Sequence, residues 1–203
     1  MYDYVIVGAG SAGCVLAARL TEDPDVRVLV LESGPPDVNQ NIHVPLGYLQ
    51  LGRTEIDWDF ATAPEPFCAG RRIPLPRGRT LGGSSSINAM VYIRGNRADY
   101  DGWGIPGWSY DDLLPYFKKA EDNERGEDEW HGVGGPLPVS DGRSRNPMSR
   151  AFAQAGVEAG HPANDDFNAA DMGFFERLSD TGRGPPTPWY SLAPRSLSSA
   201  LMK

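Results

Sequence analysis

The sequence predicts an α/β protein, because an apolar strand leads into a glycine turn, a helix follows the turn, and a second strand follows the helix. The first strand is expected over 2–7, the glycine turn over 8–13, the helix over 11–21 and the second strand over 26–32. Both strands carry unbroken apolar runs, so we expect them to be parallel and covered on both faces. Together they predict a right-handed βαβ unit.

Each residue type in the glycine turn suits the binding of a dinucleotide. Gly8 permits a tight turn, Gly10 lets the backbone approach a pyrophosphate, and Gly13 lets the helix pack closely on the strand. The helix begins at Ser11 and Ala12, where backbone N–H groups would face the phosphate charge. The turn therefore predicts a Rossmann-like nucleotide-binding domain.

Glu32 ends the second strand at about 20 residues from the glycine turn, which is the spacing of the dinucleotide fingerprint. A carboxylate at this place can accept hydrogen bonds from the hydroxyls of the adenosine ribose, and it would repel a 2′-phosphate. The fingerprint is shared by NAD and FAD, so on its own it leaves the cofactor open.

A second glycine-rich motif lies at 77–95 and contains Gly82 and Gly83 followed by three serines. Paired glycines let the backbone pass against a planar cofactor. The serines supply N-cap hydroxyls, so a short helix is expected to begin near Ser84, with its N–H groups free to bind oxygens of the cofactor.

The second motif resembles the first signature of the glucose-methanol-choline (GMC) family of flavin-dependent oxidoreductases. The resemblance lies in Gly78-Arg79, Leu81-Gly82-Gly83-Ser84-Ser85, Ile87-Asn88, Tyr92, Gly95 and Asp101. Further similar stretches are Asp57-Trp58-Asp59-Phe60, Trp108-Ser109-Tyr110 and His131-Gly132, and the resemblance covers residues 1–178. It looks strongest for the branch of choline dehydrogenases and bacterial aliphatic alcohol dehydrogenases.

The resemblance implies FAD as cofactor and an alcohol as substrate, with hydride transfer from the alcohol carbon to flavin N5. Oxygen, a quinone or another carrier would then accept the electrons. Some relatives link the flavin covalently through a histidine at the position of Ile87, so we expect FAD to be held non-covalently here. The residues expected to contact it are Gly8, Gly10, Ser11, Ala12, Gly13, Glu32, Arg79, Gly82, Gly83, Ser84, Asn88, Ala89, Met90 and Val91.

The catalytic residue is unknown from this sequence. Relatives carry a catalytic histidine near the C-terminus, and no residue here corresponds to it. His43, His131 and His161 lie in loop-like contexts without a carboxylate partner at a useful spacing, so we do not expect them to be catalytic. The chain is thus expected to be a truncated gene product, inactive alone. The alternatives are a non-catalytic nucleotide-binding or interaction fragment and an NAD-dependent Rossmann enzyme.

The remaining pattern predicts the domain organisation. We expect residues 1–140 to form the N-terminal part of an incomplete FAD-binding domain, residues 141–178 to begin an α+β substrate domain, and residues 179–203 to form an atypical Ser/Pro-rich tail. Helices are expected at 109–119 and 146–160. Extended chain is expected over 33–76, and surface loops over 123–141.

Charge and composition narrow the classes of partner. The net charge of −8 disfavours a nucleic-acid surface, and no apolar stretch reaches the length needed to span a bilayer. We expect a cytoplasmic protein, with a peripheral place at the inner face of the membrane as the alternative. Cys14 and Cys68 lack metal-binding spacing and are expected to be ordinary thiols, and no metal site is expected.

Overall fold

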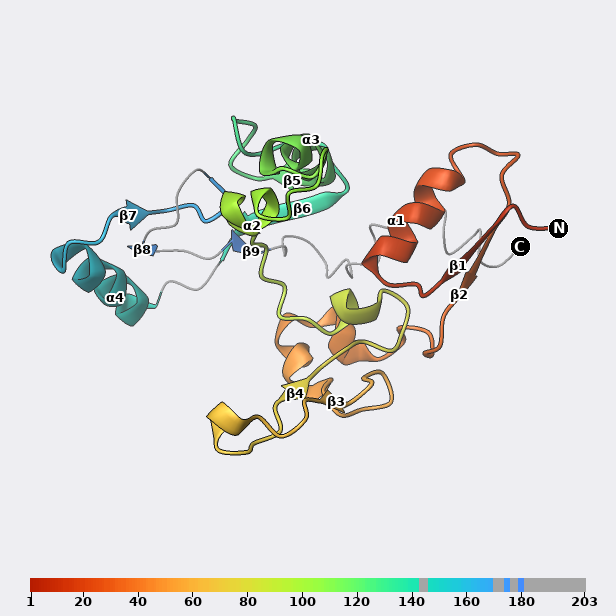
Figure 1. The fold of residues 1–203 in the computed structure, drawn as a ribbon, viewed down its shortest axis with the longest axis horizontal. Helices are drawn as coiled ribbons and strands as arrows, with labels where there is room; N and C mark the ends of the chain where they lie inside the picture. Colours follow the sequence, from red (N-terminus) through yellow and green to blue (C-terminus); the bar gives the residue numbers. More distant parts are fainter. Residues whose placement is uncertain (143–145, 170–173, 176–178, 181–203) are drawn as a thin grey trace. The chain divides into compact units, whose positions relative to one another are not determined.

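The computed structural model describes residues 1–142, 146–169, 174–175 and 179–180 (Figure 1). These residues belong to two compact units, one within Met1–Ala89 and one within Met90–Arg183. The predicted domains at 1–140 and 141–178 stay a prediction, and most of the predicted tail at 179–203 lies outside the described residues.

The first unit begins with the predicted βαβ arrangement (Figure 1). Strand β1 (Tyr4–Val7) and strand β2 (Val28–Leu31) are parallel, in the register Tyr4 to Val28 through Val7 to Leu31. Helix α1 (Ser11–Leu20) joins them and buries Gly13, Cys14 and Ala17. The parallel pairing is confirmed.

The expectation that both faces of this strand pair are covered is wrong for the structure. Val5 and Val7 of β1 are 57% and 84% exposed, although both are large apolar side chains. Helix α1 contacts β1 and β2. The described residues therefore bury only part of the apolar side chains of these two strands.

The segment after β2 is more ordered than its composition predicts. It forms the 3₁₀ helices η1 (Gln40–His43) and η2 (Pro45–Gln50), then a two-stranded antiparallel sheet of β3 (Phe60–Ala61) and β4 (Pro74–Leu75). A third 3₁₀ helix, η3 (Pro66–Cys68), lies in the connection between these strands. A small core of Leu51, Ile56 and Ile87 lies in this part of the unit. The helix predicted near Ser84 is one 3₁₀ turn, η4 (Gly83–Ser86).

The second unit begins with two helices that carry their own N-caps. Helix α2 (Arg97–Asp101) starts with a capping box made by Asn96 and Asp99, and helix α3 (Tyr110–Ala120) with one made by Ser109 and Asp112. In a capping box each side chain satisfies a backbone N–H at the helix start. The predicted helix at 109–119 is thus confirmed.

The prediction of surface loops over 123–141 is confirmed for most of residues 124–136, which form largely exposed loops, and is wrong at both ends, where strands lie. Strand β5 (Glu121–Asn123) pairs in parallel with β6 (Leu137–Asp141), and β9 (Ser179–Asp180) pairs antiparallel with β6. The buried residues of 121–141 are Glu121, Asn123, His131, Gly132, Val139 and Ser140. Most acidic residues of this region are exposed, whereas the polar side chains of Glu121, Asn123 and His131 are buried.

Helix α4 (Pro147–Glu158) confirms the second helix that the sequence predicts. Asn146 is its N-cap and accepts a hydrogen bond from the Met148 N–H, and Gly160 beyond its end has φ +93°. Strand β7 (Ala163–Asn164) then pairs in parallel with β8 (Phe174–Phe175). None of the helices in the described ranges has the length and apolarity to cross a membrane.

Candidate functional site

The first glycine turn has the conformation expected of a dinucleotide-binding loop. Gly8 has φ +99° and its N–H donates to the Leu31 carbonyl at 2.7 Å. A Cβ at Gly13 would overlap the Gly8 carbonyl oxygen, so only glycine lets α1 pack this closely on the turn. Apart from its two neighbours in the chain, no described residue has an atom within 4 Å of where a Cβ of Gly10 would stand. Packing within the protein therefore does not require glycine at position 10. The open space beside its backbone is consistent with the close approach of a ligand.

The start of α1 offers donors that the helix itself does not use. Gly10 is the N-cap and supplies no side-chain cap, while its carbonyl accepts the Cys14 N–H at 2.9 Å. The first N–H groups of an α-helix have no intrahelical acceptor, and the helix dipole makes this end positive. Ser11 and Ala12 are exposed. The turn can thus bind a phosphate through its backbone.

The two glycine motifs are in direct backbone contact. The Gly82 N–H donates to the Ala9 carbonyl at 2.8 Å, and Gly10 and Gly82 form a parallel β-bridge. Gly83 has φ +58°, and a Cβ added to it would stand 3.0 Å from the Gly10 Cα. The hydroxyls of Ser11 and Ser85 are hydrogen-bonded to each other. One continuous surface of glycine backbone results.

A second layer of close contacts holds the signature motif to the loop after β2. A Cβ at Gly78 would overlap the Gly83 carbonyl, and a Cβ at Gly34 would overlap the Arg79 carbonyl. The fully buried Thr80 hydroxyl donates to the Pro35 carbonyl at 2.8 Å. Glycine is needed at these positions because the two chain segments touch through their backbones.

Glu32 lies at the end of β2, where the sequence places it. Its Oε2 accepts the Ala9 N–H at 2.8 Å and its Oε1 accepts the Gly34 N–H at 2.9 Å. A carboxylate has about four lone-pair sites, so two backbone bonds leave acceptor capacity for ribose hydroxyls. The bonds orient the carboxylate against the glycine turn.

The expected residues that follow Gly83 are divided between the two units. Ser84, Asn88 and Ala89 are exposed residues of the first unit, and Ser84 Oγ accepts the Gly78 N–H at 3.1 Å. Met90, with φ +60°, and the exposed Val91 begin the second unit. Their contact with a cofactor stays a prediction.

The second unit contains a buried cluster of charges that the sequence did not predict. Glu121 is fully buried and accepts hydrogen bonds from Arg94 Nη2 at 2.8 Å, from Asn123 Nδ2 at 2.9 Å and from the Gly132 N–H at 3.2 Å. His131 Nδ1 lies 2.9 Å from Glu121 Oε1. We call Arg94, Glu121, His131 and Asp166 the buried ionic cluster.

The expectation that His131 lacks a carboxylate partner is therefore wrong. It is 2% exposed, and its Nε2 lies 2.8 Å from Asp166 Oδ2. Burial opposes protonation of the ring, but hydrogen bonds to Asp166 and Glu121 outweigh it and raise the pKa to about 9. His43 also has a carboxylate neighbour, Asp37, at 4.0 Å.

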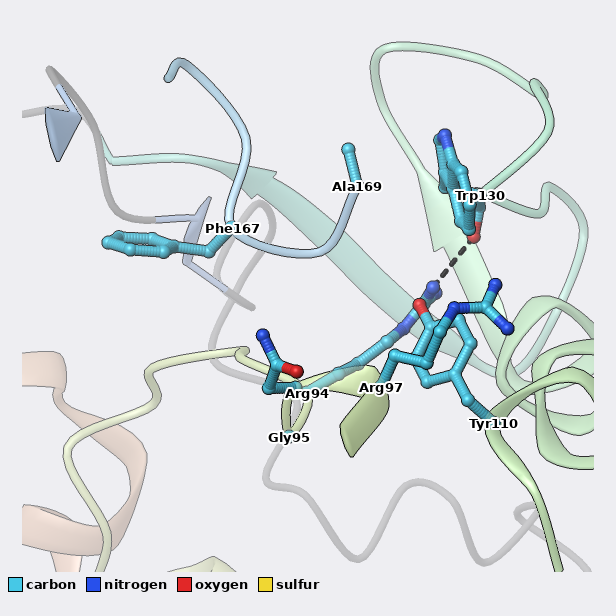
Figure 2. Close-up of a pocket in the computed structure, with 8 residues that line it drawn as sticks. Arg94, Gly95, Arg97, Tyr110, Trp130, Phe167 and Ala169 are labelled. Atoms are coloured by element: carbon cyan, nitrogen blue, oxygen red, sulfur yellow. Dashed lines mark hydrogen bonds between the residues drawn. The ribbon is translucent and has the colours of Figure 1, made fainter. Parts of the chain in front are cut away.

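The buried ionic cluster holds the chain around Arg94 in place. The Arg94 N–H donates to Asn168 Oδ1 at 2.7 Å, while Asn168 Nδ2 donates to the Tyr92 carbonyl at 3.2 Å. Arg94 Nη1 donates to the Trp130 carbonyl at 2.7 Å, the bond dashed in Figure 2. Arg94 and Tyr110 line a small cavity there (Figure 2). Glu121 and Arg94 neutralise each other within this cluster.

The described residues contain no group of three or more His, Cys, Asp or Glu side chains that could hold a metal ion. Cys14 and Cys68 are free thiols, as expected. Burial, with the charge of Glu32 as a second cause, raises the pKa of the Cys14 thiol.

Comparison with known proteins decides the family. The family model described as GMC oxidoreductase matches residues 2–181. The chain belongs to the GMC oxidoreductase family. The resemblance that the signature motif implied is thereby confirmed, as is the Rossmann-like α/β fold class.

Two relatives illustrate the similarity of this GMC chain to enzymes. It is 50% identical over 191 residues to an alcohol dehydrogenase [acceptor] of Pseudomonas putida. The matched region covers 90% of this chain and 35% of the relative. It is 51% identical over 189 residues to an oxygen-dependent choline dehydrogenase of Paraburkholderia phymatum. The matched region covers 89% of this chain and 33% of the relative. The chain thus spans about a third of the length of these relatives.

Solved structures give the same result for the fold of this GMC chain. Pyridoxine 4-oxidase from Mesorbium loti matches with a TM-score of 0.84 and 41% identity, over 90% of this chain and 37% of that one. An FAD-dependent oxidoreductase from Chaetomium thermophilum matches with a TM-score of 0.83 and 30% identity, over 98% of this chain and 37% of that one.

Proposed function

We propose that this GMC chain binds FAD non-covalently and forms the dinucleotide-binding part of an oxidoreductase that acts on the CH–OH group of an alcohol. The observation that carries the proposal is the backbone contact of Gly10 with Gly82 and Gly83. It joins a phosphate-binding helix start to the family signature in one glycine surface. Family membership supports FAD as the dinucleotide.

The residues present fit this cofactor. We assign the pyrophosphate to the turn at 8–13 and the adenosine ribose to Glu32, whose carboxylate keeps acceptor capacity. When bound, the flavin supplies a hydride acceptor at N5. The further residues that we propose to contact FAD are Arg79, Gly82, Gly83, Ser84, Asn88, Ala89, Met90 and Val91.

Non-covalent binding is supported by the place of Ile87. Its side chain is 9% exposed and belongs to the core of Leu51 and Ile56. An alkyl side chain also has no atom that could form a bond to the flavin ring. FAD should therefore leave the protein when the chain is denatured.

The proposed substrate class is choline or an aliphatic alcohol, in line with the names of the two relatives. Oxygen, a quinone or another carrier is the proposed electron acceptor. No catalytic base is assigned among the described residues. We also propose that the chain divides into domains at 1–140 and 141–178. We propose a cytoplasmic location, with association at the inner face of the membrane as the alternative.

Titration of the purified chain with FAD, followed by visible absorption, tests cofactor binding. We expect a yellow protein that releases all its FAD into the supernatant on acid precipitation, and no comparable binding of NAD. Anaerobic addition of choline or of an aliphatic alcohol then tests whether the bound flavin is reduced. A folded chain with no affinity for FAD would refute the proposal and favour a non-catalytic interaction role.

A further inference from the structure

The buried guanidinium of Arg94 has one N–H donor that the described residues leave unused. Its Nη1 donates to the carbonyls of Trp130 at 2.7 Å and Asn168 at 3.5 Å. Its Nη2 donates to Glu121 Oε2 at 2.8 Å and to the Tyr92 hydroxyl at 3.5 Å. The fifth donor of a guanidinium is the Nε–H group, and no described residue accepts a hydrogen bond from it.

Burial makes this fifth donor costly to leave unpaired. The Arg94 side chain is only 3% exposed, so bulk solvent does not satisfy the Nε–H group. Folded proteins pair nearly all their buried donors, because a donor without a partner has lost its hydrogen bond to water. A guanidinium also keeps its proton inside a protein, so loss of the proton does not remove the donor. A small acceptor beside Nε is therefore expected.

A cavity within the second unit has room for such an acceptor. It is lined in part by Arg94, Tyr110, Trp130 and Phe167, and its volume is about 20 Å³. About 10–15 Å³ is enough for one water molecule. Tyr110 is buried, and its hydroxyl points toward the Arg94 side chain (Figure 2). The cavity therefore combines an unpaired donor, a nearby hydroxyl and the volume of a single small ligand.

The charges around the cavity favour a neutral ligand over an anion. Glu121 already neutralises Arg94, with 2.8 Å between Nη2 and Oε2. Arg97, which also lines the cavity, pairs with Asp111 at 2.7 Å. A halide would have to give up its hydration shell without an unpaired positive charge to compensate for the loss. A water molecule accepts the same hydrogen bond and carries no charge.

We propose that this cavity binds one ordered water molecule, which accepts a hydrogen bond from Arg94 Nε and donates one to the Tyr110 hydroxyl. Buried waters bind between polar groups that otherwise lack partners. The water would complete the five hydrogen bonds of Arg94 and join the start of α3 to the end of the signature motif. This site goes beyond the proposed binding of FAD, because it concerns residues of the second unit alone.

Crystal structures of the wild-type chain and of Tyr110→Phe, grown with bromide in place of chloride, test the site. In the wild type we expect density for one water at about 2.7–3.2 Å from Arg94 Nε, without the anomalous signal of bromide. Tyr110→Phe removes the hydroxyl but keeps the ring, which Arg97 Cζ contacts at 4.8 Å from the centroid. This variant should lose the water.

Tyr116→Phe is the matched control, because Tyr116 lies on the same helix and is 69% exposed. It should keep the water and the unfolding equilibrium of the wild type in urea, whereas Tyr110→Phe should shift that equilibrium about fivefold or more toward the unfolded state. Three results would each overturn the proposal: no density beside Nε, a bromide peak there, or a water that Tyr110→Phe retains. If Tyr110→Phe does not fold, the wild-type density and the bromide signal decide alone.

Discussion

Arg94 and Glu121 form an ion pair inside the second unit, with Arg94 Nη2 2.8 Å from Glu121 Oε2 and side chains that are 3% and 0% exposed. The pair Arg97 and Asp111 in the same unit has a similar distance of 2.7 Å but side chains that are 45% and 72% exposed. The two pairs differ mainly in burial, so together they separate the effect of burial from that of charge.

Glu121→Gln should destabilise the protein strongly. The substitution leaves Arg94 as a buried cation without its carboxylate and leaves His131 with Asp166 alone, and breaking a buried ion pair costs about 3–5 kcal/mol. Asp111→Asn should leave the unfolding midpoint almost unchanged, because exposed ion pairs contribute little. Urea unfolding followed by circular dichroism measures both. Equal effects of the two substitutions would show that the buried ionic cluster is not what holds this unit.

Stability should fall as pH rises between about 6.5 and 9. The folded-state pKa of His131 is raised from 6.5 to about 9, so its contribution is complete below pH 6.5 and is lost as pH rises through 9. The pKa values of Glu121 and Asp166 are lowered, so their contributions are present above 4.5 and 3.8 and are lost as pH falls further. Urea midpoints from pH 4 to 10 should show a maximum near pH 5–6.5.

His131→Gln should abolish the alkaline part of this dependence, whereas His161→Gln, a change at an exposed histidine, should preserve it. An NMR titration of the His131 ring in the wild type gives an independent measurement. A midpoint near 6.5 in that titration would contradict the contacts with Glu121 and Asp166 as the source of the shift.

The sequence predicted the βαβ unit because its determinants are local. The strand, the turn at Gly8 and the close packing at Gly13 all lie within a few residues of one another, so spacing and residue type suffice. The contact of Gly10 with Gly82 was not predicted, since no local rule brings segments so far apart in the chain together.

The buried ionic cluster was missed for the same reason. His131 takes its two carboxylates from Glu121 and Asp166, which the pairing of β5 with β6 and the later chain bring to it. One local signal existed: Glu121 and Asn123 alternate with Asp122, and they lie on the buried side of β5. A period of two among polar residues is weak evidence for a strand, because such patterns normally depend on apolar residues.

Gly10→Ala and Gly13→Ala should separate ligand binding from folding. At Gly13 the new Cβ overlaps the Gly8 carbonyl, and overpacking of this kind costs about 1–3 kcal/mol. At Gly10 the new Cβ would meet no atom of the described residues beyond its chain neighbours, so the loss of stability should stay below about 1 kcal/mol, the difference between glycine and alanine at an N-cap. Thermal midpoints and FAD titrations should show Gly10→Ala folded but weak in FAD binding. Unchanged FAD affinity in that variant would contradict the assignment of the pyrophosphate to this turn.

Gly78→Ala should disrupt the signature motif, whereas Gly52→Ala should be tolerated. The Cβ at Gly78 would overlap the Gly83 carbonyl, so the backbone that carries Gly82 and Gly83 must move, at a cost of about 1–3 kcal/mol. At Gly52 the nearest atom is Asp57 Oδ2 at 3.9 Å, an ordinary contact. Movement at Gly83 also breaks its contact with Gly10, so Gly78→Ala should weaken FAD binding in proportion to its loss of stability. Similar thermal midpoints for the two variants would mean that the signature is not held by backbone contact at Gly78.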